Sequence, residues 1–212
     1  MKRVIILVAV MALTTGIFAQ DNIQFAISPV KMNSLYVGVD NPLHIAVAGV
    51  QADKISVTIS QGTITKLSGV EYVVRPTTPG EAKIGIITET NGQKKETGSM
   101  MFRVKMLPTP IAKVAGKESG VIDLDVLAAQ KGVIADMEDF LFDVRFTVTQ
   151  FNVSVATPQG EKVEKSNSSN FTDAQKELIN NLTSGQRIFI TNIKAKYQEE
   201  IRDLRDISFT IK

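Results

Sequence analysis

The sequence predicts a mainly β protein with two domains, an immunoglobulin-like β-sandwich followed by a β-rich domain that carries one packed helix. Three features of the 212-residue chain support this fold class. Short apolar runs alternate with polar residues at period two, which is the spacing of half-buried strands. Turn sequences recur between these runs, and a proline-rich stretch at 107–110 divides the chain. We therefore expect the sandwich at 23–106 and the second domain at 107–212.

The first 19 residues have the pattern of a secretory signal peptide. Lys2 and Arg3 precede an apolar run at 4–13, and the Ile-Phe-Ala sequence at 17–19 ends in the small residue that signal peptidase accepts. The alternative is an uncleaved membrane anchor, but the apolar run is shorter than the roughly 20 residues that span a bilayer. We expect cleavage after Ala19. No cysteine follows this site, which excludes a lipid-anchored lipoprotein.

The net charge of the mature chain argues against a nucleic-acid partner. Of the 24 basic side chains, two lie in the signal peptide, so cleavage leaves 22 basic and 22 acidic side chains. A formally neutral protein has no footprint for nucleic acid. The chain has no cysteine, so no disulfide can form, and each domain depends on its hydrophobic core.

The first domain is predicted to consist of short strands separated by turns. At 54–60 the three β-branched apolar residues share one face and the polar residues share the other. Asn91-Gly92 lies between two apolar runs and favours a tight type I′ hairpin, because both residues tolerate positive φ. The strands are expected at 25–27, 35–37, 43–48, 54–60, 63–67, 71–74, 82–88 and 99–105.

The second domain is organised around one long strand at 141–155. Its apolar residues alternate with polar ones up to Thr149, and there the apolar set shifts by one residue. A plain strand cannot shift in this way without turning its apolar side to water, so we expect a β-bulge near 149–150. The apolar positions are Phe142, Val144, Phe146 and Val148, followed by Phe151, Val153 and Val155.

A helix near 173–182 is predicted to pack on the sheet. Thr172 and Gln175 have the spacing of a capping box, with Thr172 as the N-cap. We expect Gly185 to stop the helix at its C-terminal end. The apolar stripe at helical spacing consists of Ala174, Leu178, Ile179 and Leu182.

The rest of the second domain has a less regular spacing of apolar residues, so its helices and strands are less clearly defined. A short helix is expected within 122–130, beginning near Ser119 or Asp123. Residues 197–206 fit either a helix or a hairpin. The prolines at 107–110 favour an extended, semi-rigid linker. Further strands are expected at 187–193 and 207–211.

The composition offers little for catalysis. His44 is the only histidine and lies in a predicted strand, where a packed or surface role is the ordinary one. A serine triad, a cysteine dyad and a zinc site all need residue types that this chain lacks or has only once. The glycines at 116–120 do not have the spacing of a phosphate-binding loop. We therefore expect no enzyme, no cofactor, and no catalytic or metal-binding residues.

An acidic run is the one cluster that could carry chemistry. Paired carboxylates can serve glycoside hydrolysis or bind calcium. However, the run lacks the glycine spacing of an EF-hand, and strand alternation would place its side chains on two faces. We expect solvated charges that protect a sheet edge. The run comprises Asp136, Glu138, Asp139 and Asp143, with Asp123 and Asp125 upstream.

Several stretches, taken in order, carry a family resemblance. They are LYVGVDNP at 35–42, YVVRP at 72–76, FRVK at 102–105, PIAKVAG at 110–116 and GVIA at 132–135. Together they resemble the C-terminal periplasmic half of the GldM/PorM family, which belongs to the gliding-motility and type IX secretion machinery of Bacteroidetes. The resemblance covers about 23–212. It implies two successive β-domains, of which the second dimerises or contacts partners, and it carries over no catalytic residue.

The resemblance implies a non-enzymatic, exported structural and interaction protein, similar to the partner-binding end of the family. Family members begin with a transmembrane helix and a helical periplasmic domain, whereas here we expect β-domains directly after the signal peptide and no anchor after cleavage. The implied partners are cell-envelope proteins, by resemblance secretion-ring components, with a homodimer left open. The implied location is the periplasm, with secretion left open. The alternative function is an extracellular carbohydrate-binding or adhesive β-sandwich protein.

The signal peptide gives a direct prediction. The exported protein should begin at or near Gln20, because the site that ends at Ala19 meets the requirement of signal peptidase for a small residue. Intact-mass analysis of the protein recovered from the cell envelope measures this. An exported protein that still contains Met1 would contradict the prediction.

Overall fold

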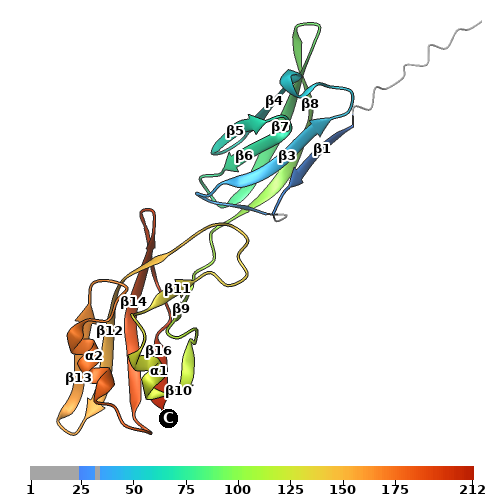
Figure 1. Cartoon of the computed structure of the whole chain (residues 1–212). Helices are drawn as coiled ribbons and strands as arrows, with labels where there is room; N and C mark the ends of the chain where they lie inside the picture. The colour runs from blue at the N-terminus through green and yellow to red at the C-terminus, as the bar shows by residue number, and fades with distance from the viewer. Residues whose placement is uncertain (1–23, 32–33) are drawn as a thin grey trace, which may run out of the picture.

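The protein is mainly β, as predicted. The computed structural model describes residues 24–31 and 34–212, so the predicted signal peptide lies outside the described residues. Strands hold 57% of the described residues and helices 9%. Two β units lie end to end (Figure 1), and each has a buried apolar cluster. No helix within the described ranges is both long and apolar enough to cross a membrane.

The first unit is a sandwich of two four-stranded sheets. One sheet has the strand order β1-β3-β6-β5, and the other has the order β2-β8-β7-β4, in which β2 runs parallel to β8. The apolar residues of both inner faces form one core, as alternation requires. The strands are β1 (Phe25–Pro29), β2 (Leu35–Tyr36), β3 (Asn41–Val47), β4 (Ile55–Ile59), β5 (Thr63–Ser68), β6 (Glu71–Arg75), β7 (Gly80–Thr90) and β8 (Gln93–Lys105).

Each strand predicted for the first unit is present, with ends that differ by up to six residues, the largest difference being the start of β8 at Gln93 instead of residue 99. The start of the strand predicted at 54–60 was wrong by one residue, because η1 (Ala52–Lys54) forms a 3-10 turn there. The Asn91-Gly92 hairpin is confirmed: Thr90 pairs with Gln93, and the φ angles of Asn91 and Gly92 are 52° and 74°. Positive φ at both turn residues is the geometry of a type I′ turn.

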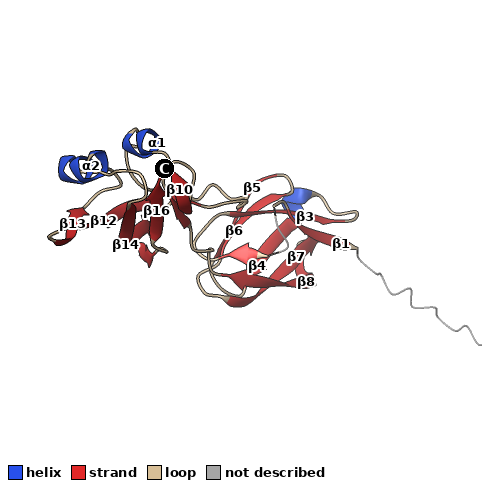
Figure 2. Cartoon of the chain, turned by 90° about the horizontal axis from the view of Figure 1, so that it is seen from below, coloured by secondary structure: helices blue, strands red, loops and turns tan. Residues whose placement is uncertain are grey.

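The second unit has a larger sheet covered on one face by helices (Figure 2). Its strand order is β10-β16-β14-β12-β13, with β15 also paired to β14. A separate two-stranded sheet joins β9 to β11. The elements are β9 (Ile111–Lys113), β10 (Ser119–Ile122), α1 (Leu124–Ala128), β11 (Ile134–Asp136), β12 (Thr147–Thr157), β13 (Gly160–Ser166), α2 (Asp173–Asn180), β14 (Arg187–Tyr197), β15 (Glu200–Asp203) and β16 (Ile207–Ile211).

The long strand of the second unit is shorter than predicted but has the predicted faces. Its sheet pairing begins at Thr147, whereas the sequence favoured a strand from 141. The β-bulge is confirmed, since the register with β14 shifts on both sides of Gln150. All seven apolar positions of the alternation are buried, including Phe151 and Val153 at 0% exposed area. The bulge therefore keeps one apolar face buried on both sides of the shift.

The capping box of the predicted helix is confirmed. Thr172 is the N-cap of α2, its hydroxyl accepts from the Gln175 N–H, and the Gln175 side chain accepts from the Thr172 N–H. The predicted stop at Gly185 was wrong, because the helix ends at Asn180 and Gly185 lies in the turn before β14. Ala174, predicted to lie on the apolar stripe, is exposed. Gln175 is fully buried instead, and its side-chain amide is satisfied by donating to the Glu164 carbonyl.

The two open assignments of the second unit are settled. Residues 197–206 contain the hairpin of β14 and β15, in which Tyr197 pairs with Glu200. The short helix α1 begins after Asp123, so two helices accompany the sheet instead of one. Four strands were not predicted, β9, β10, β11 and β13, because they are short or strongly polar. Gly132, just before β11, passes so near Ser169 that a Cβ atom would lie 1.9 Å from its carbonyl oxygen.

The faces of β12 and the segment before it predict unequal costs for two adjacent substitutions. Phe146 is 5% exposed, so Phe146→Ala should lower the free energy of unfolding by about 3–5 kcal/mol through cavity formation. Thr147 is exposed, so Thr147→Ala should cost about 1 kcal/mol or less. Urea unfolding of the mature chain measures both. Equal, small losses would contradict the assignment of the faces.

Candidate interaction site

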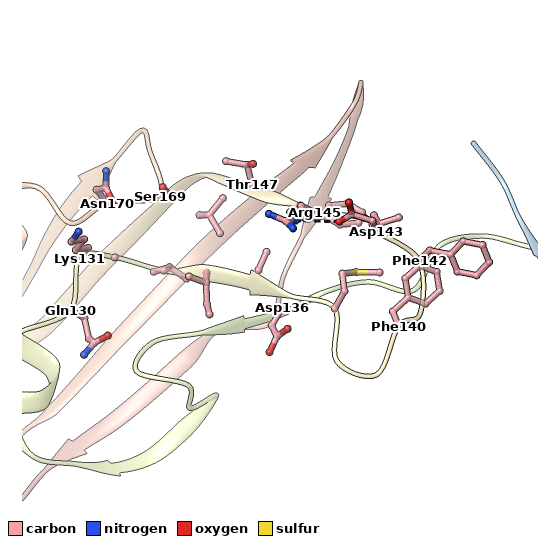
Figure 3. A pocket seen from close by; sticks show the side chains of 18 of the residues that line it. Gln130, Lys131, Asp136, Phe140, Phe142, Asp143, Arg145, Thr147, Ser169 and Asn170 are labelled. Carbon is pink, nitrogen blue, oxygen red and sulfur yellow. Dashed lines mark hydrogen bonds and ion pairs between the residues drawn. The ribbon is translucent and has the colours of Figure 1, made fainter. Parts of the chain in front are cut away.

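A groove runs along the side of the second unit (Figure 3). It has a volume of about 840 Å³ and lies between the chain at 129–137 and the chain at 142–148. Ser169 and Asn170 close one end. The size is within the range of binding pockets in proteins, and the groove is open to solvent along its length.

One wall of the groove is a strand edge without a partner. Among the described residues, β13 pairs with β12 only from Phe151 onward, and β14 pairs with it only from Thr147 onward. Residues 143–146 thus precede the sheet and pair with no described strand. They keep the alternation of a strand, with Val144 buried while Asp143 and Arg145 are exposed. Val144 donates its N–H to the Phe142 carbonyl at 2.9 Å, so part of this edge is bonded within the segment itself.

The opposite wall is held by a cluster of charged side chains. Lys113 on β9 donates to Asp136 on β11 at 2.9 Å and also to Glu138. The Lys113 side chain is only 10% exposed, whereas both carboxylates are about half exposed. Hydrogen bonds to Glu138 and then Asp136 raise the pKa of the Lys113 ammonium, and they outweigh its partial burial. The lysine therefore stays charged at neutral pH and fixes the loop that follows β11.

Two members of the acidic run do not have the role that was predicted for the whole run, which was that of solvated charges at a sheet edge. Asp136 and Glu138 are bound to Lys113 and are not simply solvated. Asp143 is the member that lies exposed on a strand edge, where its carboxylate accepts from Arg145 at 3.2 Å. Within the described ranges no three His, Cys, Asp or Glu residues converge as metal ligands. His44 is exposed on β3, away from the groove.

An aromatic cluster joins the loop after β11 to the first unit. The ring of Tyr36 lies 4.9 Å from that of Phe140 and 5.3 Å from that of Phe142, both nearly edge to face. Lys31, also from the first unit, lies 4.9 Å from the centre of the Phe142 ring. Tyr36 is 6% exposed and belongs to the apolar core of the second unit. The two units therefore share buried surface at this junction.

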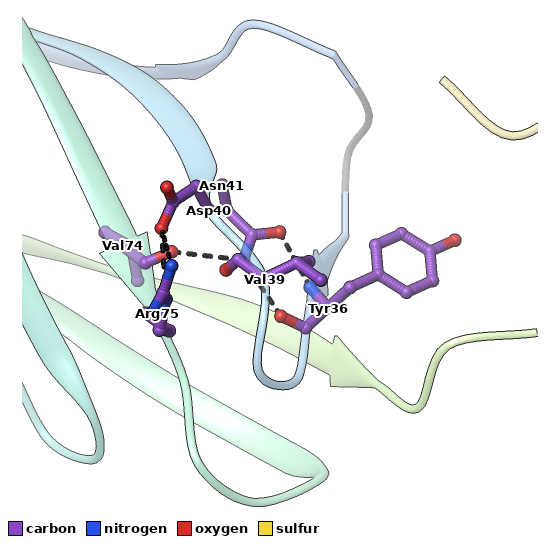
Figure 4. Close-up of polar contacts among 6 residues, drawn as sticks. All are labelled: Tyr36, Val39, Asp40, Asn41, Val74 and Arg75. Atoms are coloured by element: carbon purple, nitrogen blue, oxygen red, sulfur yellow. Dashed lines mark hydrogen bonds and ion pairs between the residues drawn. The ribbon is translucent and has the colours of Figure 1, made fainter. Parts of the chain in front are cut away.

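A buried asparagine holds Tyr36 in position (Figure 4). The Asn41 side chain accepts from the Tyr36 N–H at 2.7 Å and donates to the Tyr36 carbonyl at 2.9 Å. It also donates to the carbonyls of Val39 and Val74. Asn41 is 1% exposed, so these bonds satisfy an amide that would otherwise be costly to bury. The turn that carries Tyr36 is thereby bonded to β6.

A second contact fixes the linker between the units. Arg202 on β15 donates to the Leu107 carbonyl at 2.7 Å, and its guanidinium also pairs with Glu200. The same guanidinium lies 5.2 Å from the centre of the Phe146 ring. Leu107 itself is buried. The linker predicted from its prolines is thus anchored by a specific hydrogen bond.

Sequence reasoning missed the residues that build this site. Tyr36 and Phe140 lie in short or irregular segments, where periodicity gives no indication of burial. Asn41 lies in the resembling stretch at 35–42, and an asparagine followed by proline at a strand start is consistent with a side chain that bonds to backbone. Lys113 lies in the resembling stretch at 110–116, but no local pattern marks a lysine as buried.

The groove has the chemistry of a polypeptide-binding site. One wall is a segment that pairs with no described strand, and each wall contributes a buried apolar side chain, Val133 from one and Val144 from the other. An extended segment added to a free sheet edge gains main-chain hydrogen bonds and places alternate side chains toward the protein. The arrangement can bind a strand and offers no described catalytic group.

A family model of the GldM third domain matches residues 24–105, and a model of the GldM C-terminal domain matches residues 108–212. No curated protein matches the chain in sequence.

Several solved structures with tandem β-domains align weakly with the chain. A Dscam structure aligns at 10% identity and TM-score 0.26, covering 89% of this chain and 53% of that chain, so this chain spans about half of its length. Domains 6–7 of the surface layer protein SbsC align at 10% identity and TM-score 0.29, covering 88% and 97%. The Ig1-2 module of the Drosophila receptor tyrosine phosphatase DLAR aligns at 10% identity and TM-score 0.25, covering 89% and 98%.

The junction predicts different effects for two substitutions of one residue. Tyr36→Ala should lower the free energy of unfolding by about 3 kcal/mol, because it removes a buried ring between two cores. Tyr36→Phe keeps the ring and should cost less than about 1 kcal/mol. Urea unfolding gives these values, and small-angle scattering should show a broader distribution of interunit distances for the alanine variant. An equal loss in both variants would assign the stability to the hydroxyl instead of the ring.

Proposed function

The chain belongs to the GldM family of structural components of the gliding and type IX secretion machinery, and on this premise we propose that it acts as an exported, partner-binding protein of the cell envelope. The observation that carries the proposal is the pair of adjacent family matches, which together extend over 24–105 and 108–212. Both matched regions are β units, and the binding role is assigned to them by analogy with the family.

The structure supports a binding role through its rigidity and its open edge. The contacts of Tyr36 and Arg202 couple the two units, so that they can act as one extended body. The groove beside residues 143–146 offers a preformed surface for a polypeptide. Interfaces on rigid scaffolds lose less conformational entropy when a partner binds. The domain division after residue 106, the cleavage after Ala19 and the location in the periplasm are parts of the same proposal.

The partners in the proposal are proteins of the secretion or gliding machinery, by resemblance secretion-ring components, together with a second copy of the chain. In the family, GldM domains of this kind lie in the periplasm. A protein in the periplasm can contact the envelope components of the machinery. The carbohydrate-binding or adhesive alternative would be supported by aromatic side chains exposed together on one sheet face. In the described part of the chain, the large apolar side chains that are exposed are aliphatic residues and methionines.

Affinity purification from the native envelope tests the proposal. The full-length chain with a C-terminal tag is expressed in its own host, cross-linked mildly and purified for mass spectrometry. We expect enrichment of secretion or gliding components over a tagged, exported β-sandwich protein unrelated to this family. Recovery of glycans without any of these proteins would overturn the proposal in favour of the adhesive alternative.

A further inference from the structure

The groove and the junction between the units share aromatic side chains. Phe140 and Phe142 line the groove, and their rings lie 4.9 Å and 5.3 Å from the ring of Tyr36 in the first unit. Lys31, also from the first unit, lies 4.9 Å from the centre of the Phe142 ring. Tyr36 and Lys31 themselves lie outside the lining of the groove. The two phenylalanine rings therefore connect the groove with the first unit.

A third ring of the groove is connected with the linker. The Phe146 ring lies 5.2 Å from the guanidinium of Arg202, which donates to the Leu107 carbonyl at 2.7 Å. The ring of Tyr197 packs on Phe146 at 5.5 Å. Phe146 is only 5% exposed, so these contacts are buried ones. The wall of the groove at 142–148 is thus supported at the same place where the two units meet.

The opposite end of the groove is fixed within the second unit. Val133 donates its N–H to the Ser169 carbonyl at 2.8 Å, and Phe171 donates its N–H to the Lys131 carbonyl at 2.8 Å. Figure 3 shows Lys131 at this end of the groove and Phe142 at the other end. Backbone hydrogen bonds therefore hold one end, whereas packing against the first unit holds the other.

The two walls are also joined at the end that contacts the first unit. The chain leaves the wall at 129–137, turns with a hydrogen bond from the Phe140 N–H to the Met137 carbonyl at 3.1 Å, and returns as the wall at 142–148. This turn is the part of the second unit that Tyr36 contacts. Packed contacts have discrete arrangements instead of a continuous range. A rotation of the first unit would therefore shift the turn as a whole and change the separation of the walls.

We propose that the groove and the junction form one conformational device, in which the orientation of the first unit sets the width of the groove. An occupant that fits one width stabilises the matching orientation, and this coupling is reciprocal by thermodynamic linkage. The natural occupant is a polypeptide segment of a partner, so the inference rests on the proposed function for the identity of its ligand. A partner bound in the groove thereby fixes how the two units are oriented.

Spin labels test the coupling in the mature chain, because the sequence has no cysteine and labels attach only where one is introduced. Ile134→Cys and Arg145→Cys place one label on each wall, at side chains that are 55% and 89% exposed. Double electron–electron resonance measures the distance between them. Tyr36→Ala should broaden the distance distribution to about twice its width, because the end of the groove loses its support. Tyr36→Phe keeps the ring and should leave the distribution unchanged.

A control pair distinguishes this coupling from a general loosening of the second unit. Val163→Cys on β13 and Lys176→Cys on α2 lie outside the lining of the groove, and Tyr36→Ala should leave their distance distribution unchanged. Broadening of both pairs would overturn the proposal, because the whole unit would then be loosened. A groove pair that Tyr36→Ala does not broaden would also overturn it, since the junction would not control the walls.

The reverse direction is tested with an artificial occupant, which needs no change at the junction. Fluorescein maleimide attached to the Ile134→Cys variant places a bulky group in the groove, and small-angle scattering should then show a broader distribution of interunit distances. The same label on the Val163→Cys variant should leave the distribution unchanged. Equal distributions for the two labelled variants would overturn the proposal, even where Tyr36→Ala fails to fold. Recovery of envelope components by affinity purification does not depend on these distances, so either result can fail without the other.

Discussion

The second unit depends on one constraint, which is that a single apolar face stays buried from Phe142 to Val155. The alternation of this face continues through a bulge at Gln150, where an extra residue restores the side that faces the core. The central sheet is assembled on β12, with β14 on one side and β13 on the other. The same alternation continues beyond the sheet into residues 143–146, where it supports the groove and the exposed edge instead of a strand pair.

The junction between the units shows how polar groups hold an apolar contact in place. Asn41 bonds the turn that carries Tyr36, and Lys113 holds the loop that carries Phe140. The hydrogen bonds of each polar residue stay within its own unit, and they fix segments near the rings that meet at the junction. Rings that are held in this way lose little conformational freedom when they pack together. One polar network in each unit thus holds a segment that contributes a ring to the junction.

An exposed strand edge is a hazard for most β proteins, and this chain manages it with charge. Asp143 and Arg145 keep the edge hydrated in the monomer, since both side chains extend into solvent. Protection against general aggregation can thus arise from these two residues.

The sequence by itself determined the local elements that depend on neighbouring residues. Period-two alternation located the strands of the first unit and the buried face around β12, the capping box located α2, and Asn91-Gly92 located a hairpin. Ordered similarity to one family also placed both units. Only the tertiary structure decided that residues 143–146 remain unpaired, that Lys113 is buried against two carboxylates, and that Gln175 fills the place expected for Ala174. These features depend on which distant segments meet, and local periodicity carries no information about strand partners, strand ends or the burial of a single polar side chain.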